Sequence, residues 1–238
     1  MSEPKLKFFD ERKTPIDMLV LHCSALSGAE MFEVFNAQKV STHYIIDENG
    51  QVLSGVDEAK CAWHAGKSFW RGREGLNSCS VGIEISSPSL GQEPYSEKQI
   101  SALIPLCQKI IAKYKIPAFN VVGHSDIAPL RKADPGCAFP WERLAQEGIG
   151  WWPKGKEATS SAAADIKELL SSIGYDTRDN EVLKASAYAF CRRFLPQYVE
   201  KVDDVSYLIE HVLPDNFDFM REDLFVRQLL RPGKRLEA

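Results

Sequence analysis

The chain has 238 residues, 44% of them apolar and 26% charged, which is enough for one large domain or one domain with a smaller second one. Its formal net charge is −4, and no basic block resembles a phosphate-binding stripe, which argues against a nucleic-acid partner. No apolar run approaches the roughly 18 residues of a membrane-spanning helix, so we expect no transmembrane span.

The six cysteines are scattered without a C-x-x-C pair, which is not the pattern of a disulfide framework. Cys107 and Cys191 fall in helical apolar patterns and are expected in the core. The opening residues, MSEPKLKFFDERKTPID, lack the apolar stretch of a signal peptide. We therefore expect either a cytoplasmic protein or an envelope protein whose signal was removed or is atypical.

Short apolar runs alternate with helical patterns through the first 150 residues. Strands are predicted at 16–23, in a hairpin over 42–56 around Asn49-Gly50, at 77–86 and at 119–122. Helical spacing appears at 28–39 and most clearly at 96–115, where Ser96 and Gln99 have the capping-box spacing and Pro105 predicts a kink or a displaced start. This order predicts an α/β domain with a mixed central sheet flanked by helices.

The chain after Pro153 changes character. Residues 154–164 (KGKEATSSAAA) are small and polar and are interpreted as a linker. Residues 165–238 predict a small all-α domain with helices near 165–172, 181–195 and 203–213, followed by a fourth helix or an apolar tail over 216–230. A unit of this size is marginal on its own, so we expect it to lean on the first domain, residues 1–153.

Three polar positions stand out against the apolar strands. His22 closes the first strand, and Glu84 lies on the face opposite Val81 and Ile83, so it is either solvent-facing or functional. His124 follows a strand and precedes a loop that carries a carboxylate and a thiol within thirteen residues. This third pattern indicates either a zinc half-site or an ordinary surface loop.

Five segments resemble the zinc-dependent N-acetylmuramoyl-L-alanine amidases of the amidase-2 type, whose fold is shared with peptidoglycan recognition proteins. They are LVLHCSA (19–25), VSTHYIID (40–47), AWHAG (62–66), NSCSVGIEI (77–85) and GHSDIAPLRKADPGCAFPW (123–141). They occur in family order over more than half the chain. The run WERLAQEGIGWWP and the helical region after it resemble the envelope branch, which appends a peptidoglycan-binding module.

The resemblance implies a zinc hydrolase that cleaves the amide between the lactyl group of N-acetylmuramic acid and L-alanine in peptidoglycan or muropeptides. It implies one zinc ion per chain, bound by His22, His124 and Asp134, with one position left for water. Glu84 would take the water proton and pass it to the leaving amine, and Lys132 would stabilise the oxyanion. It also implies substrate contacts from His43, Trp63, His64 and Ala65, although a buried structural role is equally open for His43.

Several alternatives accompany this interpretation. Some members of the fold use a cysteine as third ligand, and Cys137 lies near Asp134, although Lys-x-Asp-Pro-Gly fits the carboxylate version better. Two alternatives to an envelope amidase are a muropeptide-binding module without catalysis and a cytoplasmic amidase that recycles anhydro-muropeptides. The segment GYDTRD resembles the start of a peptidoglycan-binding module, or belongs to a degenerate packing domain. The spacing of Ser2 and Lys5, typical of serine acyl-enzymes, is interpreted as chance.

Overall fold

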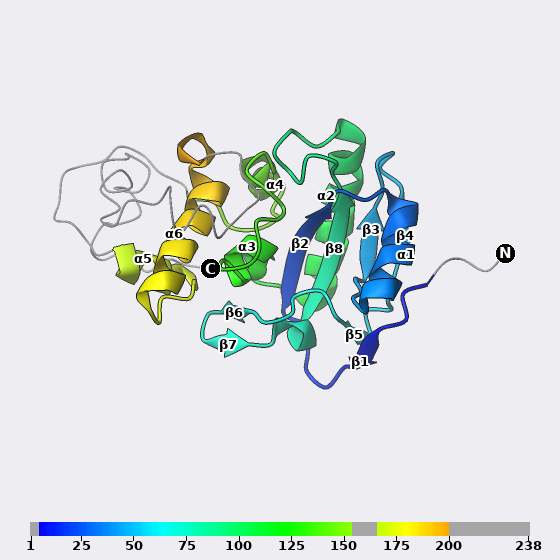
Figure 1. Ribbon diagram of the computed structural model, residues 1–238, viewed down its shortest axis with the longest axis horizontal. Coiled ribbons are helices and arrows are strands. Elements are labelled where there is room, and N and C mark those ends of the chain that lie inside the picture. Colours follow the sequence, from blue (N-terminus) through cyan, green and yellow to red (C-terminus); the bar gives the residue numbers. More distant parts are fainter. Residues whose placement is uncertain (1–4, 154–165, 200–238) are drawn as a thin grey trace.

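The computed structural model describes residues 5–153 and 166–199. Its centre is a five-stranded sheet in the order β4-β3-β8-β2-β9 (Figure 1). The strands are β2 (Met18–Ser24), β3 (Tyr44–Ile46), β4 (Val52–Ser54), β8 (Ser80–Ser86) and β9 (Val121–Gly123). β3, β8, β2 and β9 are parallel and β4 is antiparallel, which confirms the predicted α/β class with a mixed sheet.

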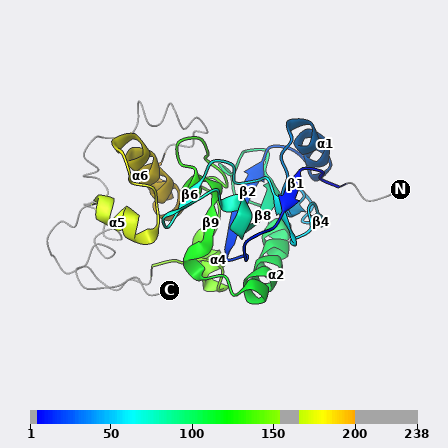
Figure 2. The ribbon, with the colours of Figure 1, turned by 90° about the horizontal axis from the view of Figure 1, so that it is seen from below.

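The two faces of the sheet are covered differently. Leu19 and Leu21 of β2 belong to the apolar cluster formed with α2 (Glu97–Tyr114), whereas Met18 and Val20 belong to a cluster on the opposite face. α1 (Gly28–Gln38) lies over the β3–β4 side, and Figure 2 shows α1 and α2 on opposite sides of the sheet. His22 alternates with its neighbours and therefore shares the face turned away from α2.

Local signals place the helices and the hairpin. At the start of α2, Ser96 accepts from the backbone of Gln99 and the Gln99 side chain accepts in return, which is the predicted capping box. The helix continues through Pro105 and buries Cys107 completely. The hairpin of β3 and β4 turns at Gly50, whose φ of 82° suits glycine.

Smaller elements surround the sheet. Two small sheets pair β1 (Phe9–Glu11) with β5 (Lys60–Ala62) and β6 (Phe69–Trp70) with β7 (Arg73–Glu74). Two 3-10 helices, η1 (Leu76–Cys79) and η2 (Ala118–Asn120), lead into β8 and β9, so these strands begin later than predicted. Two short helices follow β9, namely α3 (His124–Ile127) and α4 (Trp141–Gln146). A 3-10 helix, η3 (Pro196–Tyr198), lies at the end of the described residues.

The described part of the helical region packs against the sheet. α5 (Ile166–Ile173) and α6 (Asn180–Phe194) contribute Leu170 and Phe190 to the same apolar cluster as Val20 and Trp70. The Trp70 indole also contacts Tyr175 edge-on, with 5.0 Å between ring centroids. These helices therefore share a core with the first domain. Figure 1 shows α6 beside α3.

Some predictions fall outside the described residues: the linker 154–164, the helix at 203–213, the apolar segment 216–230 and Ser2. None of the helices in 5–153 and 166–199 is long and apolar enough to cross a membrane.

The loop that follows α3 is held by close backbone contact with the loop after β8. Tyr95 donates its hydroxyl to the carbonyl of Pro135 at 2.7 Å, and Ala138 donates its amide to the carbonyl of Gly91 at 2.9 Å. Gly91 has a φ of 73°, and a Cβ atom placed on it would lie 1.8 Å from the carbonyl oxygen of Pro135. Only glycine fits there without moving the loop.

We expect Gly91→Ala to lower the free energy of unfolding by more than about 2 kcal/mol, because it adds a backbone clash to the cost of a left-handed conformation. The matched control is Gly72→Ala, which has a φ of 78° but meets no atom within 4 Å. Its expected loss is about 1 kcal/mol. Urea unfolding of both variants measures the difference, and equal losses would contradict the close contact.

Candidate functional site

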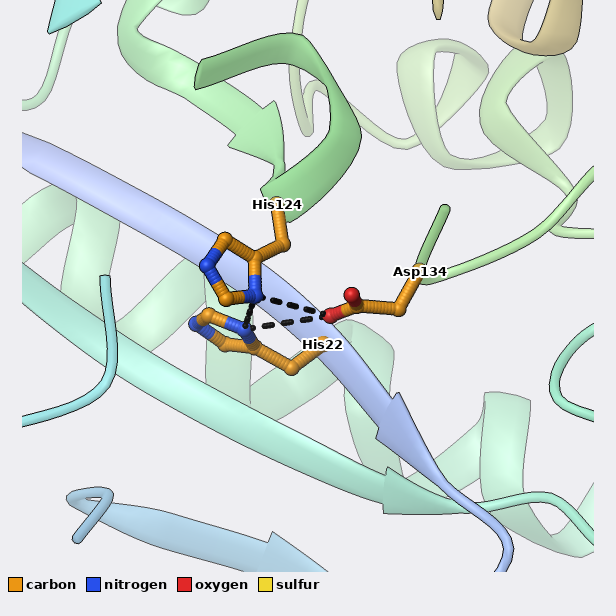
Figure 3. Close-up of side chains that lie close together, drawn as sticks. All are labelled: His22, His124 and Asp134. Atoms are coloured by element: carbon orange, nitrogen blue, oxygen red, sulfur yellow. Dashed lines mark hydrogen bonds and ion pairs between the residues drawn. The ribbon is translucent and has the colours of Figure 1, made fainter. Parts of the chain in front are cut away.

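Three side chains converge on one point at the edge of the sheet (Figure 3). The Nδ1 atoms of His22 and His124 lie 3.0 Å apart, and Asp134 Oδ2 lies 3.3 Å from the first and 3.1 Å from the second. His22 lies near the end of β2, His124 begins α3, and Asp134 lies on the loop after it. The structure therefore brings together residues separated by more than a hundred positions.

Strand register explains the meeting of the two histidines. β2 and β9 are parallel, and Leu21 pairs with Gly123. The next residues in the two strands are therefore His22 and His124, which leave the sheet side by side at its carboxyl edge. In open α/β sheets this edge is the usual place for a ligand.

The third member of the cluster is a carboxylate and not a thiol. Asp134 joins the two histidines in the group of described residues able to hold a metal, and Cys137 is not part of it. Two imidazole nitrogens and a carboxylate oxygen, all within 4.8 Å of one another, are donors suited to zinc with one open position.

Protonation states agree with metal binding. Burial first, and then the electrostatic interaction with the neighbouring His124, lowers the pKa of His22 to about 4, so the His22 ring is neutral near pH 7. Burial opposes ionisation of Asp134, but the two histidines hold the pKa of its carboxyl well below the usual range. Neutral imidazole and ionised carboxylate are the forms that bind a metal.

A hydrogen-bond chain sets the tautomer of His22. Ser80 donates its hydroxyl to the carbonyl of Leu76 at 2.7 Å, so it accepts from His64 Nε2 at 3.1 Å. His64 Nδ1 then has a lone pair and accepts from His22 Nε2 at 3.0 Å. This order leaves the lone pair of His22 on Nδ1, the atom that faces the cluster.

The second histidine is oriented by a backbone carbonyl. His124 Nε2 lies 3.2 Å from the carbonyl oxygen of Ala65, an acceptor, and 3.5 Å from Arg131 Nη2, a donor. The shorter contact favours the tautomer with the proton on Nε2 and the lone pair on Nδ1. The Arg131 guanidinium donates to the same carbonyl. Asn77 holds this segment by accepting from the amides of His64 and Ala65 at 3.1 and 2.6 Å.

Glu84 pairs in register with His22 across β2 and β8 and is 8% exposed. Burial, and then the negative charge of Asp134, raises the pKa of Glu84 well above its usual value, whereas Lys132 lowers it. Lys132 lies on the loop two residues before Asp134 and is half-buried. The site therefore combines the Glu84 carboxyl, which has a raised pKa, with the positive charge of Lys132 close to the cluster of His22, His124 and Asp134.

The four predicted substrate contacts occupy different places. His43 is completely buried, accepts from the amide of Gly82 at Nδ1 and lies 3.2 Å from the carbonyl of Lys60 at Nε2, which favours the structural role left open for it. The Trp63 indole donates to Asp10 at 2.8 Å, toward β1. His64 hydrogen-bonds to His22, and the carbonyl of Ala65 lies within hydrogen-bond distance of His124. Substrate contact by any of these four residues stays a prediction.

Sequence reasoning missed the supporting residues Ser80, Asn77 and Arg131. A signal existed for Ser80, because it alternates with Gly82 and Glu84 and so lies on the functional face of β8. The close fit of His64 over Gly82, where a Cβ atom would lie 2.6 Å from the ring, had no such signal because it depends on tertiary packing.

Comparisons with known proteins agree with the geometry. The family model described as N-acetylmuramoyl-L-alanine amidase matches residues 12–137. The chain is 40% identical over 187 residues to N-acetylmuramoyl-L-alanine amidase AmiD of Escherichia coli strain K12, which covers 68% of each protein. It is 43% identical over 105 residues to 1,6-anhydro-N-acetylmuramyl-L-alanine amidase AmpD of Enterobacter cloacae, which covers 44% of this chain and 55% of that protein.

Solved structures of amidases with bound muropeptides also resemble this chain. The complex of Escherichia coli AmiD with anhydro-N-acetylmuramic acid-L-Ala-D-gamma-Glu-L-Lys matches with a TM-score of 0.69 and 35% identity, covering 83% of this chain and 88% of that one. AmpDh3 of Pseudomonas aeruginosa in complex with anhydromuramic pentapeptide matches with a TM-score of 0.70 and 31% identity, covering 82% and 89%. Each match covers more than four fifths of this chain.

The hydrogen-bond chain makes His64 a test of the site. We expect His64→Leu to weaken zinc binding about 10- to 100-fold, because His22 loses the acceptor that sets its tautomer. Competition with a chromogenic chelator measures the affinity. Trp63→Phe is the control, since it removes only the bond to Asp10, and an unchanged affinity in His64→Leu would contradict the chain.

His43 predicts a pH dependence of stability. Burial lowers its pKa from 6.5 in the unfolded chain to about 4 in the folded protein. Its contribution to stability is therefore complete above pH 6.5 and is lost as the pH falls toward 4, because the unfolded chain takes up the proton first.

In His43→Asn the amide oxygen still accepts from Gly82, but the titrating ring is gone. We expect the free energy of unfolding of this variant to vary less between pH 7 and 4 than that of the wild type, by up to about 3 kcal/mol. Urea unfolding across this range measures the slope, and identical slopes would contradict a buried neutral His43.

Proposed function

This chain belongs to the N-acetylmuramoyl-L-alanine amidase family, and on this premise we propose how its own residues carry out the reaction. It is an amide hydrolase that cleaves the bond between the lactyl group of N-acetylmuramic acid and L-alanine of stem peptides. We propose 1,6-anhydro-muropeptides among its substrates, because the names of AmpD relatives specify them and AmiD was solved with one.

The observation that carries this proposal is the cluster of His22, His124 and Asp134 with Glu84 in register beside it. We propose that the cluster holds one zinc ion, since two imidazole nitrogens and an ionised carboxylate match its preferences. When bound, zinc would supply Lewis acidity that lowers the pKa of water in the site to about 7.

Glu84 is proposed as the general base and acid. Its buried carboxylate accepts a proton from the attacking water as the water oxygen bonds to the lactyl carbonyl carbon. As the carbon–nitrogen bond breaks, Glu84 returns the proton to the nitrogen of L-alanine, which leaves as an amine. The raised pKa of Glu84 suits both halves of this cycle, because the group holds the proton long enough to deliver it.

Lys132 is proposed to stabilise the negative charge that develops on the carbonyl oxygen. Its charge already lowers the pKa of Glu84 and His22, so its field extends over the reacting region. A fixed cation in a partly buried site stabilises an oxyanion more than water does and needs no reorganisation. Lys132 therefore complements Glu84: one group moves the proton and the other holds the charge.

The cellular setting is proposed from the cysteines. None of the six cysteines is in a disulfide, and five of them are buried. Several cysteines without a disulfide suit a reducing compartment, which supports cytoplasmic recycling of anhydro-muropeptides. The helical region after residue 165 instead supports the envelope branch. Relative kcat/KM on an anhydro-muropeptide and on its ordinary counterpart tests the recycling role, and a preference for the ordinary sugar would contradict it.

Replacement of the base tests the mechanism. We expect Glu84→Gln to lower kcat by about 10²- to 10⁴-fold, because glutamine has the same shape but cannot accept the proton. Release of free peptide from a muramyl-tripeptide measures the rate, and zinc content measured in parallel should stay at the wild-type level. Near-normal turnover in Glu84→Gln would show that another group moves the proton.

Metal removal tests the proposed cofactor. Treatment with a chelator is expected to abolish cleavage of the same muramyl-tripeptide, and added zinc is expected to restore it, since three ligands leave the metal exchangeable. His124→Ala should lose metal and activity together. Full activity in chelated, zinc-free protein would contradict a zinc hydrolase.

A further inference from the structure

A buried carboxylate outside the metal cluster lies next to the proposed ligand His124 in the chain. Asp126, two residues after His124, is 1% exposed, and its Oδ2 accepts from the backbone amide of Gly123 at 2.8 Å. Its other partners come from the C-terminal helical region. Tyr175 donates its hydroxyl to Oδ1 at 2.6 Å, and Arg193 donates from Nη1 to Oδ2 at 2.8 Å.

Arg193 reaches across from α6 to the sheet. Its guanidinium lies 3.9 Å from the ring centroid of Trp141, and Nη2 is 3.2 Å from the carbonyl of Val121 in β9. The side chains of Arg193 and Asp126 are 6% and 1% exposed, so this ion pair is almost inaccessible to solvent. Removing one partner of such a pair leaves an uncompensated buried charge, which is strongly unfavourable.

The contacts converge on one turn. Gly123 ends β9 and His124 begins α3, so the direction of the His124 ring depends on the backbone between them. Asp126 fixes this backbone by accepting from Gly123, and Tyr175 and Arg193 fix Asp126. α6 lies beside α3 in Figure 1, which is the arrangement that these bonds require.

We infer that Tyr175 and Arg193 are positioning residues, which hold the metal ligand His124 in place through Asp126. The helical region is then a working part of the catalytic unit, whatever else it binds. This inference rests on the proposed metal site, because its consequence is measured there. Partners behind a metal ligand usually change metal affinity about 10- to 100-fold when they are removed.

The variants separate positioning from plain stability. Tyr175→Phe removes one hydrogen bond and keeps the ring beside Trp70, and Arg193→Lys keeps the charge but not the several donors. Val182→Ala is a control that trims a buried side chain of α6 without touching Asp126. Arg178→Ala is a second control, which removes an exposed ion pair to Glu74 and an ion pair to the buried Asp176 without changing any partner of Asp126.

The first readout is cobalt binding to the metal-free, full-length protein, followed by the visible absorption of the bound ion. We expect Tyr175→Phe to bind Co²⁺ about tenfold more weakly with a shifted spectrum, and Arg193→Lys to show at least the same loss. Arg178→Ala and Val182→Ala should keep the wild-type spectrum and affinity. Wild-type affinity in Tyr175→Phe, or an equal loss in Val182→Ala at matched stability, would overturn the inference.

The second readout needs no metal. Hydrogen exchange of peptides covering residues 121–131 should accelerate in Tyr175→Phe, while peptides from β8 keep their wild-type rates. Unchanged exchange over 121–131 would overturn the inference by itself. A wild-type protein that binds no cobalt would instead contradict the proposed metal site, and the exchange comparison would still decide the role of Tyr175.

Discussion

The site depends on the register of three parallel strands. Pairing of Leu21 with Gly123 puts His22 next to His124, and pairing of His22 with Glu84 puts the carboxyl on the adjacent strand. A shift of one residue in either pairing would turn these side chains to the face packed against α2. The apolar residues of β2 and β8 that alternate with His22 and Glu84 are buried against α2 and so fix the register. The same strand pairing therefore determines both the apolar core and the arrangement of the site residues.

Burial then gives the clustered groups their chemistry. His22 stays neutral because it is buried, Asp134 stays ionised because two histidines face it, and Glu84 holds protons readily for the same reason that it is costly to bury. His22 donates to His64 and His124 donates to the carbonyl of Ala65, and these two hydrogen bonds turn the Nδ1 lone pairs toward one point. The site is thus organised before any ligand arrives, which is a condition for tight and specific metal binding.

Much of this was predictable from the sequence, and the reasons for the rest are physical. Period-two alternation placed Glu84 on its face, and the capping box placed α2, because both signals are local. The short helix beginning at His124 and the contact of Arg193 with Asp126 had no local signal, since each depends on segments far apart in the chain. Asp134 and Cys137 could be ranked by motif, but only the fold shows which of them lies beside the histidines.

The proposed metal ion between His22, His124 and Asp134 can be located by crystallography of the zinc-loaded protein, with diffraction data collected on both sides of the zinc absorption edge. We expect a single anomalous peak bonded to Nδ1 of both histidines and to a carboxylate oxygen of Asp134. A peak bonded to Cys137 or to an Nε2 atom, or no peak between these three residues, would contradict it.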